Sequence, residues 1–132
     1  MKLCKQCNEI LSDVRNTFCN NKCQAIYRTE ENINKWKLNP LEYKKLPRNV
    51  RSYLLNKSGN KCCLCGWGEI NQYSKNYALI IDHIDGNSEN NTECNLRVIC
   101  PNCDSLLPTY KALNKGNGRS FRRDRYKEGK SY

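Results

Sequence analysis

The chain has 132 residues, of which only 38% are hydrophobic, so it fits one domain or two very small ones and cannot bury a large apolar core. Its formal net charge is +10, with 23 Lys and Arg against 13 Asp and Glu, and such a charge favours a polyanionic partner. Nucleic acid is the default partner. An anionic membrane surface is the alternative, disfavoured because no amphipathic apolar face accompanies the charge.

Ten cysteines can hold such a chain together, either as disulfides or as metal ligands. The first residues lack the apolar run of a signal peptide, and the longest apolar run, residues 77–81, is too short to cross a bilayer. We therefore expect a cytoplasmic protein with reduced cysteines, which needs no membrane and no small-molecule cofactor. In that compartment regularly spaced cysteines favour zinc over disulfides.

The first cysteine group lies in residues 1–30, which we interpret as a small treble-clef-like zinc finger. Two closely spaced pairs provide four thiolates for one tetrahedral zinc: Cys4, Cys7, Cys19 and Cys23. A short hairpin is expected over residues 12–16, and Asn20 or Asn21 is expected to cap a helix through residues 24–27. The finger is either purely structural or also contacts DNA or a partner, and its modest charge does not distinguish these.

Residues 31–46 form a polar, helix-compatible segment that is either a basic linker or a strapping helix, broken at Asn39-Pro40. Basic side chains in and just after this segment make a candidate phosphate-contacting strip, although such a charge run is also typical of a solvated face: Lys35, Lys37, Lys44, Lys45, Arg48 and Arg51.

Residues 47–115 are expected to form a second, zinc-stabilised domain. Pro47 is placed at the first position of a helix, Val50 and Leu54 repeat at helical spacing, and residues 58–60 end the helix. Two further cysteine pairs suit a second tetrahedral zinc: Cys62, Cys65, Cys100 and Cys103.

Two cysteines remain, Cys63 and Cys94, and we expect them to be small buried or half-buried thiols rather than ligands. Two short β-rich runs, residues 77–81 and 96–99, are expected to pair antiparallel across a long polar loop. A helix over residues 104–113, irregular near its Pro108, should follow. The expected fold class is therefore a small, zinc-stabilised α+β protein.

The last part of the chain, from Lys111 onward, carries eight Lys or Arg against two acids and shows no core-forming pattern. Residues 116–132 are therefore expected to be a flexible basic tail. The tail either orders along a phosphate backbone or merely keeps the protein in solution.

Several motifs occur in order along residues 82–104: Asp82-His83-Ile-Asp-Gly-Asn87, Asn95-Leu-Arg-Val98 and Cys100-Pro-Asn-Cys103-Asp104. This series resembles the HNH endonuclease family in its zinc-knuckle, phage-borne and homing form, and the resemblance covers about residues 47–120. The resemblance implies a ββα-metal, treble-clef-like nuclease domain. It also implies an enzyme that is encoded by a phage and acts in a bacterial host.

The resemblance further implies four catalytic residues, which are His83, Asp82, Asn95 and Asp104. His83 would be the general base, since histidine supplies a neutral imidazole at cellular pH. Asn95 would fix the loop or the imidazole tautomer through a hydrogen bond. Asp82 and Asp104 would hold one catalytic Mg²⁺ or Mn²⁺, because carboxylate oxygens select such hard ions over zinc.

Two features complicate this site. Asp104 stands where the family usually has His or Asn. This difference leaves open which metal is preferred and how fast the catalysed reaction is. Asp82 and His83 are neighbours, and neighbours on a regular strand face opposite sides, so they share one cleft only if the strand ends or bulges there.

The expected activity is metal-dependent nicking of DNA by a monomer or a DNA-induced dimer that holds two structural Zn²⁺ and one catalytic cation. The alternatives are an inactive zinc-stapled DNA-binding module and a protein directed at RNA. The candidate DNA-contacting residues are basic side chains spread along the chain: Lys44, Lys45, Arg48, Arg51, Arg97, Lys111, Lys115, Arg119, Arg122 and Arg123.

Overall fold

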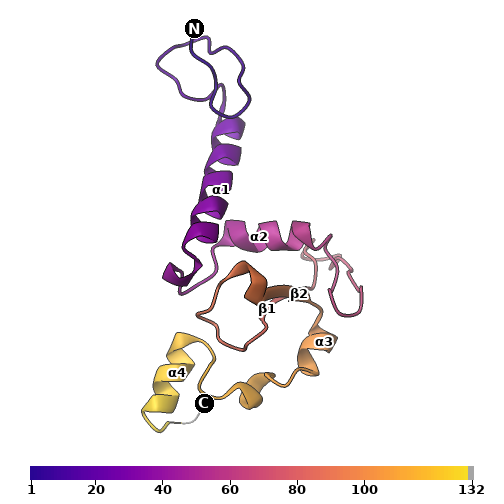
Figure 1. Ribbon diagram of the computed structural model, residues 1–132. Helices are drawn as coiled ribbons and strands as arrows, with labels where there is room; N and C mark the ends of the chain where they lie inside the picture. Colours follow the sequence, from indigo (N-terminus) through magenta and orange to yellow (C-terminus); the bar gives the residue numbers. More distant parts are fainter. Residues whose placement is uncertain (131–132) are drawn as a thin grey trace. The chain divides into compact units, whose positions relative to one another are not determined.

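A computed structural model describes residues 1–130 and divides the chain into two compact units, Met1–Leu38 and Asn39–Tyr132 (Figure 1). Residues 131 and 132, at the end of the expected tail, lie outside the described residues. Helix α1 (Asn21–Leu38) runs unbroken through residue 30, where the sequence pattern ended the finger. Within the described residues, no helix combines the length and apolarity needed to cross a bilayer.

The first unit consists of a cysteine knuckle followed by α1. An antiparallel bridge between Leu3 and Ile10 closes the knuckle. The hairpin expected over residues 12–16 is wrong: Oδ1 of Asp13 accepts a hydrogen bond from the backbone N–H of Arg15 at 2.9 Å and makes a local turn there. The helix cap is confirmed, because Oδ1 of Asn20 accepts from the backbone N–H of Cys23 at 2.8 Å.

The second unit is built on a two-stranded antiparallel sheet. Strand β1 (Ile80–His83) pairs with β2 (Leu96–Ile99), so that Asp82 lies opposite Arg97 and His83 opposite Leu96. Helix α2 (Arg48–Lys57) lies against β2, and α3 (Pro101–Ser105) lies against β1 (Figure 1). Val50 and Leu54 of α2 are buried, as their spacing predicts, but Pro47 is the N-cap of α2 rather than its first residue.

The helix expected over residues 104–113 is also wrong. Helix α3 begins at Pro101, where the sulfur of Cys100 caps it by accepting from the backbone N–H of Cys103 at 3.4 Å, and it ends at Ser105. Pro108 cannot continue such a helix. A separate 3₁₀ helix, η3 (Lys111–Asn114), follows, and two others, η1 (Pro40–Glu42) and η2 (Glu93–Asn95), lie before α2 and β2.

Within residues 116–130, the expected basic tail forms a turn and a helix, whereas the sequence predicted a flexible segment without regular structure. Helix α4 (Ser120–Lys127) follows a turn that is bonded to the loop after β1. The hydroxyl of Ser88 donates to the carbonyl of Gly118 at 2.7 Å, and Arg123 pairs with Glu89 at 2.9 Å. Polar contacts with a distant loop, rather than an apolar core, hold this segment, so no hydrophobic pattern announces it.

Cys63 and Cys94 are both exposed, contrary to the expected burial. Cys63 lies between two residues of the second cysteine cluster, and its backbone N–H donates to the carbonyl of Val98 at 2.9 Å. Cys94 lies in η2 at the edge of the loop. Neither residue belongs to a cysteine cluster of the described residues.

Candidate functional site

The structure brings Asp82, His83 and Asp104 to one open cleft of about 310 Å³. Strand β1 ends at His83, whose carbonyl accepts from the backbone N–H of Gly86 in the following turn at 2.8 Å. The end of the strand thus allows two neighbouring side chains to reach the same cleft. Asp104 enters it from α3, and three basic side chains complete its charged lining: Lys111, Arg119 and Arg122.

Asp82 is held by a cross-strand ion pair. Nε of Arg97 donates to Oδ2 of Asp82 at 2.8 Å, and the side chains of Arg97 and Asp82 are 24% and 11% exposed. This contact orients the carboxylate and engages one of its oxygens. Arg97 therefore neutralises a carboxylate of the cleft instead of standing free for a phosphate.

Asp104 has an electrostatic environment suited to a cation. Burial raises the pKa of the Asp104 carboxyl, and the negative charge of Asp82 raises it further. Two carboxylates that repel each other beside one cleft are stabilised by a divalent cation between them, and Mg²⁺ sites commonly use one or two carboxylates. The donor set of Asp82 and Asp104 therefore fits a hard divalent cation.

The imidazole of His83 contacts Asn91 and not Asn95. Nε2 of His83 lies 2.7 Å from Oδ1 of Asn91, a fully buried residue, and Nδ2 of Asn91 donates to the carbonyl of Tyr43. Nothing in the linear pattern separates Asn91 from its neighbour Asn90. The contact with Tyr43 depends on the tertiary structure.

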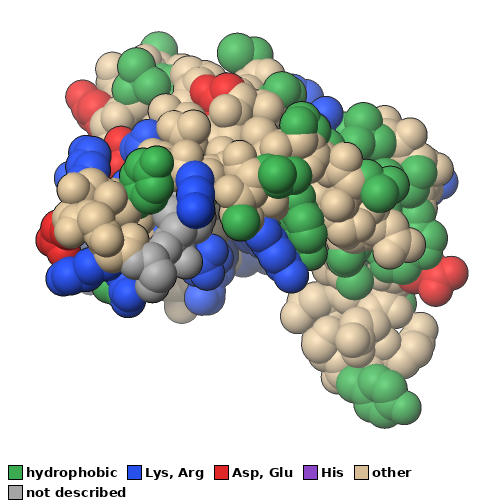
Figure 2. Space-filling view, turned by 90° about the horizontal axis from the view of Figure 1, so that it is seen from below, with side chains coloured by type: hydrophobic (Ala, Val, Ile, Leu, Met, Phe, Trp, Pro, Cys, Tyr) green, Lys and Arg blue, Asp and Glu red, His purple; other side chains and the backbone are tan. Residues whose placement is uncertain are grey.

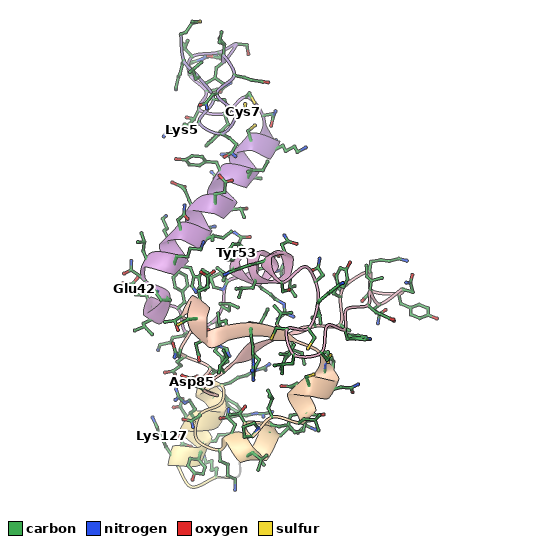
Figure 3. All side chains as sticks on the ribbon, turned by 45° about the vertical axis from the view of Figure 1, so that its right-hand side comes forward. Lys5, Cys7, Glu42, Tyr53, Asp85 and Lys127 are labelled. Carbon is green, nitrogen blue, oxygen red and sulfur yellow. The ribbon has the colours of Figure 1, made fainter. Side chains whose placement is uncertain are left out.

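Asn95 holds the loop that follows β1. Its side-chain amide donates to Oδ1 of Asp85 at 2.9 Å and to the carbonyl of Asn90 at 2.8 Å, and its oxygen accepts from the backbone N–H of Asp85 at 3.1 Å. Burial works to raise the pKa of Asp85, but hydrogen bonds from Asn90, Asn87 and Asn95 outweigh it and lower that pKa. Figure 3 shows Asp85 in this loop. Of the two roles considered for Asn95, the structure has the loop contact.

The eight paired cysteines form two clusters, each with its sulfur atoms within 4.8 Å of one another. One cluster lies in the first unit, where Figure 3 labels Cys7, and the other joins the knuckle after α2 to the start of α3. The members are those expected from the spacing: Cys4, Cys7, Cys19 and Cys23 in one, Cys62, Cys65, Cys100 and Cys103 in the other.

The ionisation of these thiols fits a bound cation. Burial opposes ionisation of Cys4 and Cys62, but backbone N–H donors outweigh it and lower the pKa of each thiol to about 6. Hydrogen bonds with neighbouring thiols raise the pKa of Cys19 and Cys103 to about 12. Four close sulfurs can be thiolates together only if a cation balances them, and Zn²⁺ with four tetrahedral thiolates is the usual solution.

A second cleft, of about 410 Å³, shares His83, Ser88 and Arg119 with the first. Lys44 and Lys45 line it, so basic side chains border His83 on two sides. Figure 2 shows Lys and Arg side chains gathered on one part of the surface.

The other candidate DNA-contacting residues differ in whether their side chains are hydrogen-bonded within the protein or exposed. Arg51 donates to the carbonyl of Leu79 at 3.3 Å, and Arg123 donates to the carbonyl of Gly116 at 3.2 Å besides its ion pair. Arg48 and Lys115 are exposed outside both clefts.

The chain is similar to the H-N-H endonuclease F-TflIV of Escherichia phage T5, with 38% identity over 72 residues. The similarity covers 51% of this chain and 30% of the phage protein, so the chain spans less than a third of that relative. No protein-family model matches the chain, and no solved structure matches it. The similarity confirms the resemblance to the HNH endonucleases over about half of the chain.

Proposed function

We propose that this chain is a metal-dependent DNA endonuclease of the HNH type, which nicks one strand at the cleft beside His83. The observation that carries the proposal is the convergence of one histidine, two carboxylates and three basic side chains on that cleft. The chain's similarity to a named H-N-H endonuclease supports it. On this proposal β1, β2 and α3 are the ββα-metal motif.

Hydrolysis of a phosphodiester needs a base for water, a positive environment for the phosphate and a means to stabilise the leaving oxygen. His83 takes the proton of the attacking water, and a positioned base of this kind contributes on the order of 10² to 10⁴ in rate. Lys111, Arg119 and Arg122 hold the phosphate in the cleft that they share with His83.

Asp82 and Asp104 would hold one Mg²⁺ or Mn²⁺, which supplies charge stabilisation at the phosphate when bound. Arg97 fixes the orientation of Asp82 toward that role, since its guanidinium occupies one carboxylate oxygen. The aspartate at position 104 serves as a ligand in place of the family's usual His or Asn.

The two cysteine clusters would each hold a structural Zn²⁺. DNA is the proposed partner, bound by a monomer or by a dimer that forms on DNA. One active site cuts one strand. A phage-encoded enzyme of this kind would act in the cytoplasm of a bacterial host.

The test is incubation of supercoiled plasmid with the native chain, His83→Ala and Asp104→Ala, each with Mg²⁺, Mn²⁺ or EDTA. Nicked circles are expected for the native chain with metal and not with EDTA, and both variants should lose at least 10²-fold in rate. Asp124→Ala is the matched control, because Asp124 is an exposed aspartate of α4 outside both clefts.

Retained DNA binding without cleavage by the native chain, under every metal condition, would replace this proposal with that of an inactive zinc-stapled DNA-binding module. Cleavage of RNA in preference to DNA in the same assay would redirect the proposal to RNA.

A further inference from the structure

We infer that Asn91 is a positioning residue, which fixes the neutral imidazole of His83 in its Nε2–H tautomer and leaves Nδ1 as the proton-accepting atom. The inference deepens the proposed nuclease function and rests on it for the catalytic consequence. The tautomer itself is a property of the folded protein and can be measured without activity.

The orientation of the Asn91 amide follows from its contact with Tyr43. The carbonyl oxygen of Tyr43 can only accept a hydrogen bond, so the amide group that faces it must be the NH₂ of Asn91. The opposite orientation would place two acceptor oxygens in close contact inside a fully buried site. The Asn91 oxygen is thereby directed at His83.

The tautomer of His83 follows from the orientation of the amide. Oδ1 of Asn91 is an acceptor and lies 2.7 Å from Nε2, so Nε2 of His83 must carry a proton and donate it. In a neutral imidazole the other nitrogen then has no proton. None of the hydrogen bonds found within residues 1–130 engages Nδ1.

The same arrangement serves the base after it has accepted a proton. In the proposed reaction a proton moves from water to Nδ1, and the water oxygen uses the freed electron pair to form a bond to phosphorus. The leaving 3′ oxygen departs with the electron pair of its own bond to phosphorus. The ring is then positively charged, and its Nε2–H remains bonded to the Asn91 oxygen, which stabilises that charge without accepting the proton.

The backbone carbonyl that fixes the orientation of Asn91 lies far from His83 in the sequence. Tyr43 directly precedes Lys44 and Lys45, which line the second cleft together with His83 and Asn91. Asn91 therefore connects the ring of the base to a backbone segment that also carries two basic side chains. Because the anchor is a backbone carbonyl, no substitution of the Tyr43 side chain removes it directly.

The first test is nuclear magnetic resonance of protein with ¹⁵N-labelled histidine, at about pH 8, where an ordinary imidazole is neutral. The chain contains a single histidine, so every ring signal belongs to His83. We expect one-bond correlation of Nε2 with a slowly exchanging proton in the native chain, and loss of that signal in Asn91→Ala. A proton on Nδ1 in the native chain, or an unchanged Nε2 proton in Asn91→Ala, would overturn the inference.

Asn87→Ala is the matched control. Asn87 lies in the same loop, and its side-chain oxygen accepts from the backbone N–H of Glu89 at 3.1 Å, whereas the side-chain hydrogen bond found for His83 within residues 1–130 goes to Asn91. This variant should keep the Nε2 proton signal of the native chain. Loss of the signal in Asn87→Ala would show that general loosening of the loop removes the proton, and would count against a specific role of Asn91.

The second test compares nicking rates. Asn91→Ala should lower kcat by about 10- to 100-fold with DNA affinity unchanged, the usual size for loss of a partner that orients a functional histidine. Asn91→Asp should not restore the native rate, because its second carboxylate oxygen would face the carbonyl oxygen of Tyr43 in place of the donating NH₂. In the His83→Ala background the further change Asn91→Ala should have no effect, because the proposed role of Asn91 acts through His83.

The two proposals fail in different ways. Absence of nicking by the native chain, with the Nε2 proton present and dependent on Asn91, contradicts the nuclease function and leaves the tautomer assignment intact. Nicking that Asn91→Ala leaves at the native rate contradicts the positioning role and leaves the nuclease function intact.

Discussion

Asp82 and Arg97 face each other across the two-stranded sheet, and Nε of Arg97 donates to Oδ2 of Asp82 at 2.8 Å. Both side chains are largely buried, which makes the pair stronger than a surface pair and its disruption more costly. The pair also explains why Arg97, a basic residue beside the proposed active site, is a poor candidate for direct phosphate contact.

Arg97→Ala should lower the free energy of unfolding by about 1–3 kcal/mol, because it leaves the largely buried carboxylate of Asp82 without its charged partner. Urea unfolding followed by circular dichroism measures this. Arg15→Ala is the control, since Arg15 forms an equally short ion pair with Asp13 but is 87% exposed. The control should change stability much less, because water screens an exposed pair. Equal effects of the two substitutions would contradict the special role of the Asp82 pair.

Lys44, Lys45 and Arg119 are expected to contact DNA phosphates, because they line the clefts beside His83. Substitution of each by Ala should reduce the slope of log affinity against log salt concentration by about 1, and should weaken binding of all sequences alike. Fluorescence anisotropy at several salt concentrations measures the slope. Lys57→Ala, which removes an equal charge paired with Glu93 at 3.5 Å, should leave the slope unchanged.

Asp104→Asn should stabilise the metal-free fold at neutral pH. Burial and the charge of Asp82 raise the pKa of Asp104 in the folded protein above the ordinary value of 3.8, so the folded state binds this proton more tightly than the unfolded state does. Its contribution to stability is therefore greatest at low pH and falls as the pH rises from the ordinary pKa through the raised one.

Thermal unfolding of both proteins between about pH 3 and pH 8, without Mg²⁺, tests this sign. Above the titration window the asparagine variant should have the higher Tm, and Mg²⁺ should raise the Tm of the native chain more than that of the variant. A lower Tm for the variant at neutral pH would show that the Asp104 carboxylate stabilises the metal-free fold.

The two cysteine clusters should bind zinc independently, because they lie in different compact units. Elemental analysis should find two zinc ions per native chain and one in Cys7→Ser or Cys100→Ser. Loss of the second site should unfold the sheet and α3 and abolish nicking, whereas Cys7→Ser should keep the nicking activity. Two zinc ions in either variant would contradict the assignment of ligands.

Much of the local structure follows from the sequence. The cysteine spacings identify both clusters, because a tetrahedral thiolate site requires two closely spaced pairs and little else from the chain. Residues with strong local preferences also behave as expected: Asn20 caps α1, and the α2 helix ends at residues 58–60. The short strand 96–99 is found where its β-branched residues predict it.

Features held by distant polar contacts could not be predicted in this way. The order of the C-terminal segment depends on Ser88 and Glu89, and the buried Asn91 is indistinguishable in sequence from the adjacent Asn90. Neither the contacts of the C-terminal segment nor the burial of Asn91 produces a periodic signal in the sequence, because a polar contact with a remote group leaves no pattern in the linear chain.

The sequence by itself determined the members of the two cysteine clusters and the strand 96–99, since spacing and local preference act between near neighbours. It placed the partner strand at residues 77–81, whereas β1 is Ile80–His83 and ends at the histidine. Only the tertiary structure decided that Asn91 and not Asn95 contacts the imidazole, and that Arg97 serves Asp82. Those contacts depend on how segments far apart in the chain approach one another, and hydrogen-bond direction then decides which atom of His83 is free.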